Sequence, residues 1–318
     1  MMPLYLLGAL AMSLCIAGLI EFQLHNRSLS SIPLRIHVNG TRGKSSVTRL
    51  VAAGLREGGL KTFAKTTGTA PRVIDPEGID RIIHRLRLPS IGEQVRLLRY
   101  FASEKPDAVV IECMAVQPQY QWIAEHQMIK SHIGVITNVR PDHLEEMGPT
   151  EEDVAYSLCN TIPNEALLIT AEDQKLDILK AVAKQNNSQV VCSDPTSVSQ
   201  KEIDLFTYIE HRSNVAIAID VCEKAGIDRQ TALNGMHKVK PDVGALVVWD
   251  LMIKESTYKF VNGMAANDPV STLGIWNSIN DRYGLGKKTC IFFNSREDRP
   301  GRTAQMIELT LSKIKPNF

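Results

Sequence analysis

The amino-acid sequence predicts an α/β protein whose main domain is a mostly parallel, P-loop-type sheet with helices on both faces. Five apolar runs have the length of buried strands, at residues 60–66, 107–112, 132–138, 166–170 and 188–193. Helical periodicity fills much of residues 91–103, 150–160, 173–184 and 212–238. Strands and helices that alternate in this way favour a parallel sheet covered on both faces.

The composition is that of an ordinary globular chain and gives no sign of a nucleic-acid partner. The 318 residues are enough for two domains and a sizeable core. With 36 basic and 35 acidic residues the net charge is +1, so neither a nucleic-acid site nor an acidic disordered segment is expected. The six cysteines are scattered without metal or redox spacing, which is typical of reduced thiols in a cytosolic body.

A glycine turn between a strand and a helix is the main candidate for a binding site. Residues 34–39 read as a short strand, and Gly40-Thr41-Arg42-Gly43-Lys44-Ser45-Ser46 follows it. Apolar residues at near-helical spacing then indicate a helix, whose free N–H groups and dipole favour a bound phosphate. In such a loop Lys44 would place a positive charge on the terminal phosphates, and the Ser45 hydroxyl would be a magnesium ligand.

The loop is shorter than the general P-loop pattern. Val38 stands where that pattern has its first glycine, so the variant here is Gly-Thr-x-Gly-Lys-Ser. A glycine turn with an exposed lysine is the alternative. The strand before the loop and the helix after it favour a nucleotide site.

Polar groups end two of the other predicted strands. Glu112 closes the run 107–112, and Asn138 closes the run 132–138 with His143 shortly beyond it. Ligands of open α/β sheets bind at the carboxyl ends of the strands. Glu112 is therefore placed as a magnesium ligand, Asn138 can pair with an adenine edge, and His143 can hold a metal or a phosphate oxygen. The alternatives are a surface glutamate and a structural imidazole.

The N-terminal residues predict a membrane anchor. Residues 4–20 carry no charge and would form a helix of about 25 Å, slightly short of a hydrocarbon core of roughly 30 Å. A signal peptide would need a basic start and a clean cleavage site, and a core helix seldom begins a chain. Arg27 and Arg35 follow the run and no basic residue precedes it, which favours a single pass through the plasma membrane with a cytoplasmic catalytic body.

These features divide the chain into three parts. Residues 1–33 are the anchor and a polar linker at 23–33, residues 34–241 are the central ATP-binding domain, and residues 242–318 are a second, incomplete α/β domain. A charged stretch at 73–90 is expected to be a surface excursion. In the second domain we expect strands at 245–250, 258–262 and 289–294 and helices near 270–281 and 303–313.

The order and spacing of the site residues resemble the Mur ligase superfamily, ATP-dependent amide ligases that include folylpolyglutamate synthase. Finer matches resemble one branch, the CapB/PgsB components of poly-γ-glutamate synthase, over essentially the whole chain. The matching segments are 39–45, 65–69, 91–94, 112–116, 142–143 with 147–150, and 262–268.

The resemblance implies a reaction and its cofactors, ATP and Mg²⁺. A carboxylate would attack the γ-phosphate to give an acyl phosphate, and an amine would then displace the phosphate. The implied partners are glutamate, the growing poly-γ-glutamate chain and an integral membrane subunit of the same synthase. The implied product is a capsule or a secreted polymer.

The resemblance also implies roles for individual residues. Lys44 and the loop amides would hold the phosphates, and the metal site would use Ser45, Glu112 and His143. Asn138 and Asn267 would lie beside the nucleotide. Lys44, Glu112 and His143 are therefore the expected catalytic residues, and the loop 67–69 would lie on the acceptor side.

Three departures separate this sequence from the superfamily. No lysine occurs between Ser131 and Gln174, where a carbamylated lysine is usual, so any second metal must use other ligands. Ala245 rather than arginine follows Gly244, and Asn262 stands in place of an aspartate. A replacement cation could come from Arg296, Arg299 or Arg302. Two other functions stay open: another Mur or folylpolyglutamate-type ligase, and a membrane-tethered P-loop ATPase that acts as a scaffold or regulator.

Overall fold

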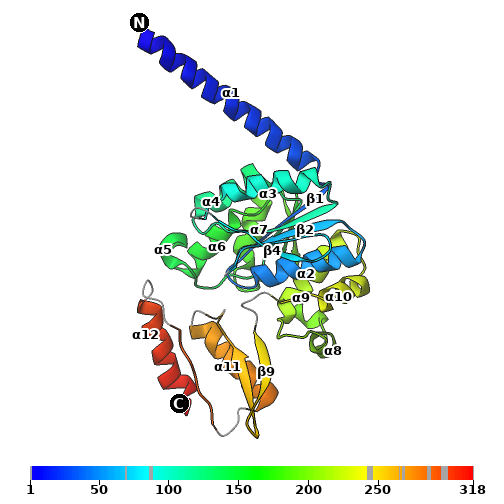
Figure 1. The fold of residues 1–318 in the computed structure, drawn as a ribbon, viewed down its shortest axis with the longest axis vertical. Coiled ribbons are helices and arrows are strands. Elements are labelled where there is room, and N and C mark those ends of the chain that lie inside the picture. The colour runs from blue at the N-terminus through cyan, green and yellow to red at the C-terminus, as the bar shows by residue number, and fades with distance from the viewer. Residues whose placement is uncertain are drawn as a thin grey trace. The chain divides into compact units, whose positions relative to one another are not determined.

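The computed structural model describes residues 2–68, 70–85, 89–241, 246–264, 266, 269–284, 288–294 and 300–317. The chain forms two compact units, Met1–Asp242 and Val243–Phe318. The first unit contains the N-terminal helix and the large sheet (Figure 1). The second contains a two-stranded sheet and two helices.

The large sheet has eight strands in the order β4-β3-β2-β5-β1-β6-β7-β8. The strands are β1 Leu34–Asn39, β2 Thr62–Thr66, β3 Arg72–Ile74, β4 Asp80–Ile82, β5 Ala108–Glu112, β6 Ile133–Ile136, β7 Leu167–Thr170 and β8 Gln189–Cys192. All neighbouring pairs from β2 to β8 are parallel, and β3 and β4 add antiparallel at one edge. The predicted fold class is confirmed.

Helices cover both faces of this sheet. They are α2 Lys44–Glu57, α3 Gly92–Ser103, α4 Pro118–Ile123, α5 Leu144–Met147, α6 Glu151–Cys159, α7 Leu176–Gln185, α8 Gln200–Asp204, α9 Arg212–Lys224 and α10 Arg229–His237, with a π-helical turn η1 Ala124–Ile129 and a 3₁₀ turn η2 Pro195–Ser197. On one face α2 packs on the strands, with α9 and α10 against it. On the other face α3, η1, α6 and α7 bury the apolar side chains that β2, β5, β6 and β7 direct toward them.

The helical pattern predicted for much of residues 212–238 is formed by two helices, α9 and α10, and the chain turns between them at Gly226. Its φ of 86° lies in the left-handed region that favours glycine. The Asp228 side chain then caps α10 by accepting a 3.1 Å hydrogen bond from the Thr231 N–H.

The stretch 73–90 was expected to be a surface excursion, and this expectation is wrong for its first half. β3 pairs with the outer edge of β2, and Val73 and Ile74 are buried. The charges that suggested a solvated loop are paired instead. Arg49 of α2 donates to both carboxylate oxygens of Asp80 at 2.9 and 2.8 Å. Such bidentate geometry satisfies both groups, so the hairpin can pack against the domain.

The N-terminal helix α1, Met2–Ser30, continues past the apolar run into the body of the first unit. By length and composition, Tyr5–Ser30 qualifies as a candidate membrane span, and its apolar stretch is exposed. The linker predicted at 23–33 is wrong, because Leu29 and Ile32 are 3% and 1% exposed and join the core beside Phe101.

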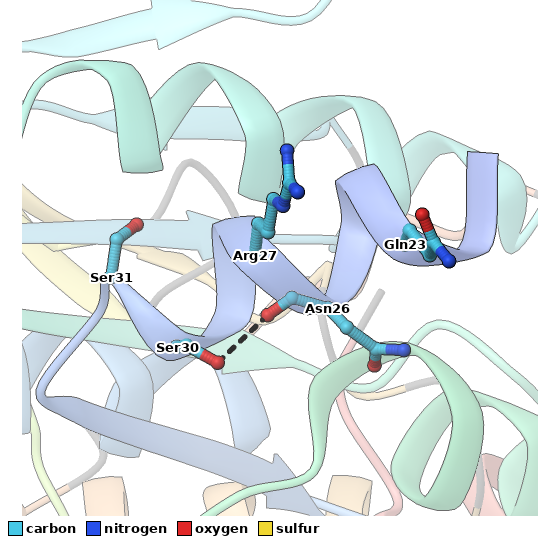
Figure 2. Close-up of a pocket in the computed structure, with 5 residues that line it drawn as sticks. All are labelled: Gln23, Asn26, Arg27, Ser30 and Ser31. Carbon is cyan, nitrogen blue, oxygen red and sulfur yellow. Dashed lines mark hydrogen bonds between the residues drawn. The ribbon is translucent and has the colours of Figure 1, made fainter. Parts of the chain in front are cut away.

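Hydrogen bonds explain why this polar segment is ordered. His25 Nε2 lies 2.8 Å from the Met128 carbonyl oxygen, and Arg35 Nη1 donates to the carbonyls of Leu29 and Ile32 at 2.7 and 2.9 Å. The polar side of the last turns lines an open pocket, formed by Gln23, Asn26, Arg27, Ser30 and Ser31 (Figure 2). The polar residues therefore face outward from a docked helix.

The second unit is built on an antiparallel hairpin. β9 Val247–Ile253 pairs with β10 Ser256–Asn262, and α11 Pro269–Tyr283, α12 Pro300–Leu309 and the π-helical turn η3 Thr310–Ile314 follow. The predicted strand at 289–294 is wrong: the structure assigns no strand there. Thr289 exchanges hydrogen bonds with Asn317, so this apolar run has no strand neighbour among the described residues.

Candidate nucleotide-binding site

Two glycines shape the loop between β1 and α2. Gly40 has a φ of 127° and Gly43 a φ of 83°, both in the region that side chains disfavour. A Cβ atom at Gly40 would lie 2.0 Å from Thr137 Oγ1, and one at Gly43 would lie 2.6 Å from Asn214 Oδ1. The loop therefore requires glycine at both positions for conformation and for space.

The loop delivers α2 with an uncapped N-terminus. Gly43 is the N-cap residue and no side chain accepts a hydrogen bond there. The free N–H groups of the first turn and the helix dipole together favour an anion. Lys44 is the first residue of this helix, and its Nζ donates to the carbonyl oxygens of Gly40 and Thr41. The lysine thus lies along the loop itself.

Ser45 and Glu112 meet at the same edge of the sheet. Ser45 Oγ donates a 2.8 Å hydrogen bond to Glu112 Oε2, which also accepts a 2.7 Å hydrogen bond from the Thr67 N–H. Glu112 is 3% exposed. A hydroxyl and a carboxylate oxygen side by side are the hard donors that Mg²⁺ prefers, so the donor set fits this ion.

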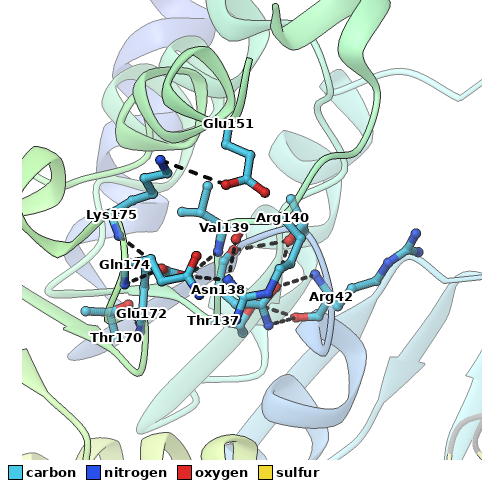
Figure 3. A network of polar contacts seen from close by, with 11 residues as sticks. Arg42, Thr137, Asn138, Val139, Arg140, Glu151, Thr170, Glu172, Gln174 and Lys175 are labelled. Carbon is cyan, nitrogen blue, oxygen red and sulfur yellow. Dashed lines mark hydrogen bonds and ion pairs between the residues drawn. The ribbon is translucent and has the colours of Figure 1, made fainter. Parts of the chain in front are cut away.

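Asn138 hydrogen-bonds to the glycine loop through its side chain, which the sequence did not predict. Its Oδ1 accepts from Thr41 Oγ1 at 2.7 Å and from the Arg42 N–H at 3.1 Å, and its Nδ2 donates to the Arg42 carbonyl at 3.0 Å (Figure 3). Thr137 Oγ1 donates to the same carbonyl at 2.6 Å. Both ends of the Asn138 amide are engaged with the loop, so its contact with an adenine stays a prediction.

His143 lies beyond the end of β6, as the N-cap residue just before α5, with a φ of 48°. Its Nδ1 lies 3.6 Å from Glu146 Oε2, and its side chain is 32% exposed. The neighbouring Asp142 connects this loop to the glycine loop, because Asp142 Oδ1 lies 3.8 Å from Arg42 Nη2. In the part of the chain that the structure describes, no hydrogen bond or ion pair joins His143 to Ser45 or Glu112. Within the described ranges, no three His, Cys, Asp or Glu side chains gather as a metal cluster.

The structure adds two groups to the site region that sequence reasoning missed. Asn214, near the start of α9, faces Gly43, and its Nδ2 donates to Glu210 Oε1 at 2.7 Å. Lys65 of β2 is fully buried, with Nζ 3.3 Å from Glu93 Oε1. Lys65 could have been noticed in the sequence, because a lysine inside a predicted strand is unusual. The sequence around Asn214 gives no such signal, because Asn214 reaches Gly43 only through the packing of α9 in the fold.

A buried charge cluster surrounds Lys65. Glu93, at the start of α3, accepts from Arg85 Nε at 2.7 Å and from Arg85 Nη2 at 3.0 Å. Burial lowers the pKa of Lys65, while the Glu93 carboxylate opposes that shift. The cluster fixes the end of β2, from which the loop at 67–69 departs.

A second buried ion pair joins β1 to η1. His37 Nδ1 is 2.7 Å from Glu125 Oε2, and Glu125 Oε1 accepts from the N–H and Oγ of Ser131 at 2.8 and 2.9 Å. Burial alone would lower the pKa of His37, but the neighbouring Cys113 and Glu125 side chains outweigh it and raise that pKa to about 9. The raised pKa favours the protonated form of His37 beside the Glu125 carboxylate.

Several predicted residues lie outside the described part of the chain. Asn267, Thr69, Arg296 and Arg299 are among them, and so are Gly244 and Ala245. The side chain of Arg302 is likewise not described. The expected roles of these residues stay predictions.

Two family models match the chain. The Mur ligase middle domain matches residues 38–248, and the poly-gamma-glutamate synthase CapB C-terminal domain matches residues 249–317. The chain is 40% identical to the capsule biosynthesis protein CapB of Bacillus anthracis, over 98% of this chain and 68% of that protein. It is 36% identical to the PGA synthase CapB of Bacillus subtilis (strain 168), over 94% of this chain and 77% of that protein.

Solved structures show the same fold. E. coli FolC in complex with DHPP and ADP gives a TM-score of 0.66 at 16% identity, covering 91% of this chain and 76% of FolC. The bifunctional folylpolyglutamate synthase/dihydrofolate synthase of Yersinia pestis, complexed with AMPPNP and Mn ion, gives 0.63 at 13% identity, covering 82% and 69%. At these identities the likeness concerns the fold alone.

Proposed function

The chain belongs to the CapB family of poly-γ-glutamate synthesis proteins, built on a Mur ligase middle domain, and we propose that it extends the polymer through an acyl phosphate formed at the Gly40–Ser46 loop. It is an ATP-dependent amide ligase. The observation that supports the site is the contact of Ser45 with Glu112 beside the uncapped start of α2. This arrangement has the free N–H groups, the cation and the oxygen donors that ATP phosphates require.

The proposed chemistry has two steps. A carboxylate oxygen of glutamate or the polymer attacks the γ-phosphorus, the bond to the β-phosphate oxygen breaks, and ADP leaves. The amine of the next glutamate then attacks the acyl carbon, loses a proton and displaces inorganic phosphate. Two anions must meet in the first step, so Lys44 and the α2 amides have to offset the charge that develops.

Lys44 has a specific part in this scheme. In the structure its Nζ donates to the carbonyl oxygens of Gly40 and Thr41 in the loop. We infer that ATP draws the ammonium group from those carbonyls to the terminal phosphates. The guanidinium of Arg42, 3.8 Å from Asp142 Oδ1, would add a second positive charge near the loop.

The oxygen donors of Ser45 and Glu112 would hold Mg²⁺ between the loop and the β5 end. When bound, the ion would neutralise phosphate charge and polarise the transferred group. His143 would reach this region through a shift of the loop that it shares with Asp142, since it is not in contact with Ser45 here. Glu112 also accepts a hydrogen bond from the Thr67 N–H. This contact would orient the start of the loop 67–69, which is predicted to lie on the side of the acceptor substrate.

Glutamate-dependent release of ADP tests the proposed reaction. The full chain in membranes or detergent should release ADP rapidly only when glutamate or its polymer is present, and hydroxylamine should trap the acyl phosphate as a hydroxamate. Lys44→Ala should abolish both signals while circular dichroism stays unchanged. ADP release that ignores glutamate would support the tethered ATPase instead, and an unimpaired Lys44→Ala variant would reject the phosphate site.

The exposed apolar part of α1 supports a place at the plasma membrane, beside an integral membrane subunit that receives the polymer. A polyanion made in the cytosol meets a barrier that is costly for charges, so synthesis at the export site is favoured. Deleting residues 1–22 removes the apolar run and leaves His25, Leu29 and Ile32 in their docked positions. The shortened protein should be soluble and bind ATP but no longer support export. Retention in the membrane fraction, or unchanged export, would contradict the anchor.

A further inference from the structure

Glu172, two residues beyond the end of β7, is a buried carboxylate that the proposed chemistry does not use. The residue is 2% exposed. A buried carboxylate is costly unless donors surround it. Four donors do so: the N–H groups of Val139, Gln174 and Lys175 at 2.7, 2.9 and 3.1 Å, and Arg140 Nη1 at 3.2 Å. Figure 3 shows these contacts converging on the one side chain.

The contacts connect the loops that follow two neighbouring strands. Gln174 and Lys175 belong to the loop after β7, which Glu172 shapes locally. Val139 and Arg140 belong to the loop after β6. Glu172 therefore holds the backbone of the loop after β6, because its carboxylate accepts a charge-assisted hydrogen bond from the Val139 N–H.

The fixed peptide is the one that joins Asn138 to Val139. Asn138 accepts from and donates to the backbone of Arg42, and its carbonyl oxygen accepts a 3.1 Å hydrogen bond from the Thr41 N–H. The glycine loop itself lacks a side-chain cap. Asn138 therefore links the glycine loop to the peptide that Glu172 holds, alongside Thr137, whose Oγ1 also donates to the Arg42 carbonyl oxygen.

We propose that Glu172 is a positioning residue for ATP, acting on the phosphate loop through Val139 and Asn138. The proposal rests on the proposed nucleotide site at Gly40–Ser46. The carboxylate lies behind the loop and is neutralised by Arg140, so it holds the loop without presenting a negative charge to the phosphates. Losing its charge should loosen the loop and weaken ATP binding, with less effect on turnover at saturation.

The principal variant is Glu172→Gln, which keeps the shape and replaces one acceptor oxygen by a donor amide. Asp75→Asn is the matched control. Asp75 is also a buried carboxylate that accepts from one backbone N–H, that of Ile79 at 2.8 Å, and from one arginine, Arg81. It belongs to the β3–β4 hairpin and makes no contact with the glycine loop among the described residues.

Binding of Mg²⁺ with a non-hydrolysable ATP analogue, by calorimetry on the full chain in detergent, is the direct readout. We expect Glu172→Gln to raise the dissociation constant about tenfold and KM for ATP by a similar factor, with kcat changed about twofold or less. Asp75→Asn should leave both constants within about twofold while lowering the melting temperature comparably. Equal affinity in Glu172→Gln and the wild type, with weakened binding in Lys44→Ala, would overturn the positioning role alone. Unchanged binding in Lys44→Ala would overturn the nucleotide site itself.

A double-mutant cycle tests the path through Asn138 and also serves if Glu172→Gln does not fold. Arg140→Met removes the half-exposed guanidinium that neutralises Glu172, and Asn138→Ala removes the contacts with Arg42. If the effects pass through one path, the double variant should lose little more affinity than Asn138→Ala. A loss of affinity in the double variant equal to the product of the two single-variant losses would overturn the proposed path.

Discussion

The Ser45 hydroxyl donates a 2.8 Å hydrogen bond to the carboxylate of Glu112, and this contact joins the helix after β1 to the end of the neighbouring strand β5. Parallel pairing places Val38 opposite Glu112, so the strand that leads into the glycine loop and the strand that carries the glutamate end together. The sheet thereby brings the two proposed metal ligands into register before any nucleotide is present.

Glu112→Gln is the first prediction. The amide retains the size of the side chain but removes the charge that the metal requires, and its NH₂ end can oppose the Thr67 N–H. We expect kcat for glutamate-dependent ADP release to fall by about 10²–10³-fold. A titration with Mg²⁺ checks the cause, since the variant should need a higher concentration for its residual activity. An unchanged magnesium requirement would remove Glu112 from the metal site.

Gly43→Ala should abolish tight ATP binding. The new Cβ would lie 2.6 Å from Asn214 Oδ1 on a backbone with a φ of 83°. Gly59→Ala is the matched control, because Gly59 has a φ of 87° and nothing within 4 Å of the added atom. Both variants should lose about 1–2 kcal/mol of stability from the backbone conformation, but only Gly43→Ala should weaken binding. Equal affinities in the two variants would show that Asn214 moves aside freely.

The His37–Glu125 pair predicts a pH dependence of stability. The folded pKa of His37 is raised to about 9 from an ordinary 6.5, so the stabilisation is complete below pH 6.5 and is lost as the pH rises through about 9. The free energy of unfolding should fall across this window, by on the order of 3 kcal/mol. Denaturant titrations at several pH values measure it. His37→Gln should flatten the profile and exposed His84→Gln should not. A wild-type slope in His37→Gln would contradict the assignment.

Lys65→Met should destabilise the first unit through its effect on Glu93. The methionine fits an apolar environment, but among the described residues Glu93 then keeps Arg85 alone as an ion-pair partner. Removing one member of a buried ion pair costs about 3 kcal/mol or more. Lys180→Met, on the exposed side of α7, controls for the substitution. Urea unfolding of both variants gives the comparison, and similar midpoints would mean that Arg85 alone satisfies Glu93.

The sequence was sufficient to predict the parallel sheet, because each of its central strands is a short apolar run and each crossover is a helix. The β3–β4 hairpin was not predictable in this way. Its acidic Asp80 pairs with Arg49, which lies 31 residues earlier in the chain, and a single sequence does not reveal such a pair. The polar residues at 23–33 suggested a linker for a related reason. His25 and Arg35 hydrogen-bond to distant or local carbonyl groups, and the apolar Leu29 and Ile32 beside them are buried.

The site was predictable where strand ends determine it. Ser45 comes shortly after β1 and Glu112 is the last residue of β5, and the carboxyl ends of such parallel strands meet at one edge. Asn214, Glu172 and the supporting contacts of Asn138 were not predictable, because each depends on where a distant segment packs. His143 shows the limit of the argument: it lies beyond the end of β6, but its loop directs it toward Glu146 rather than Ser45.

The direction from which α1 joins the sheet has a consequence for the product. The helix docks where β1 begins, at Leu34, and the glycine loop starts where β1 ends, six residues and about 20 Å away. If α1 lies in a bilayer, the glycine loop at the far end of β1 would lie on the side of the domain away from the lipid. Because Leu29 and Ile32 are packed in the core, the last turns of α1 hold the domain in this direction. A polymer formed at the loop would then have to pass along the flank of the domain to reach the membrane.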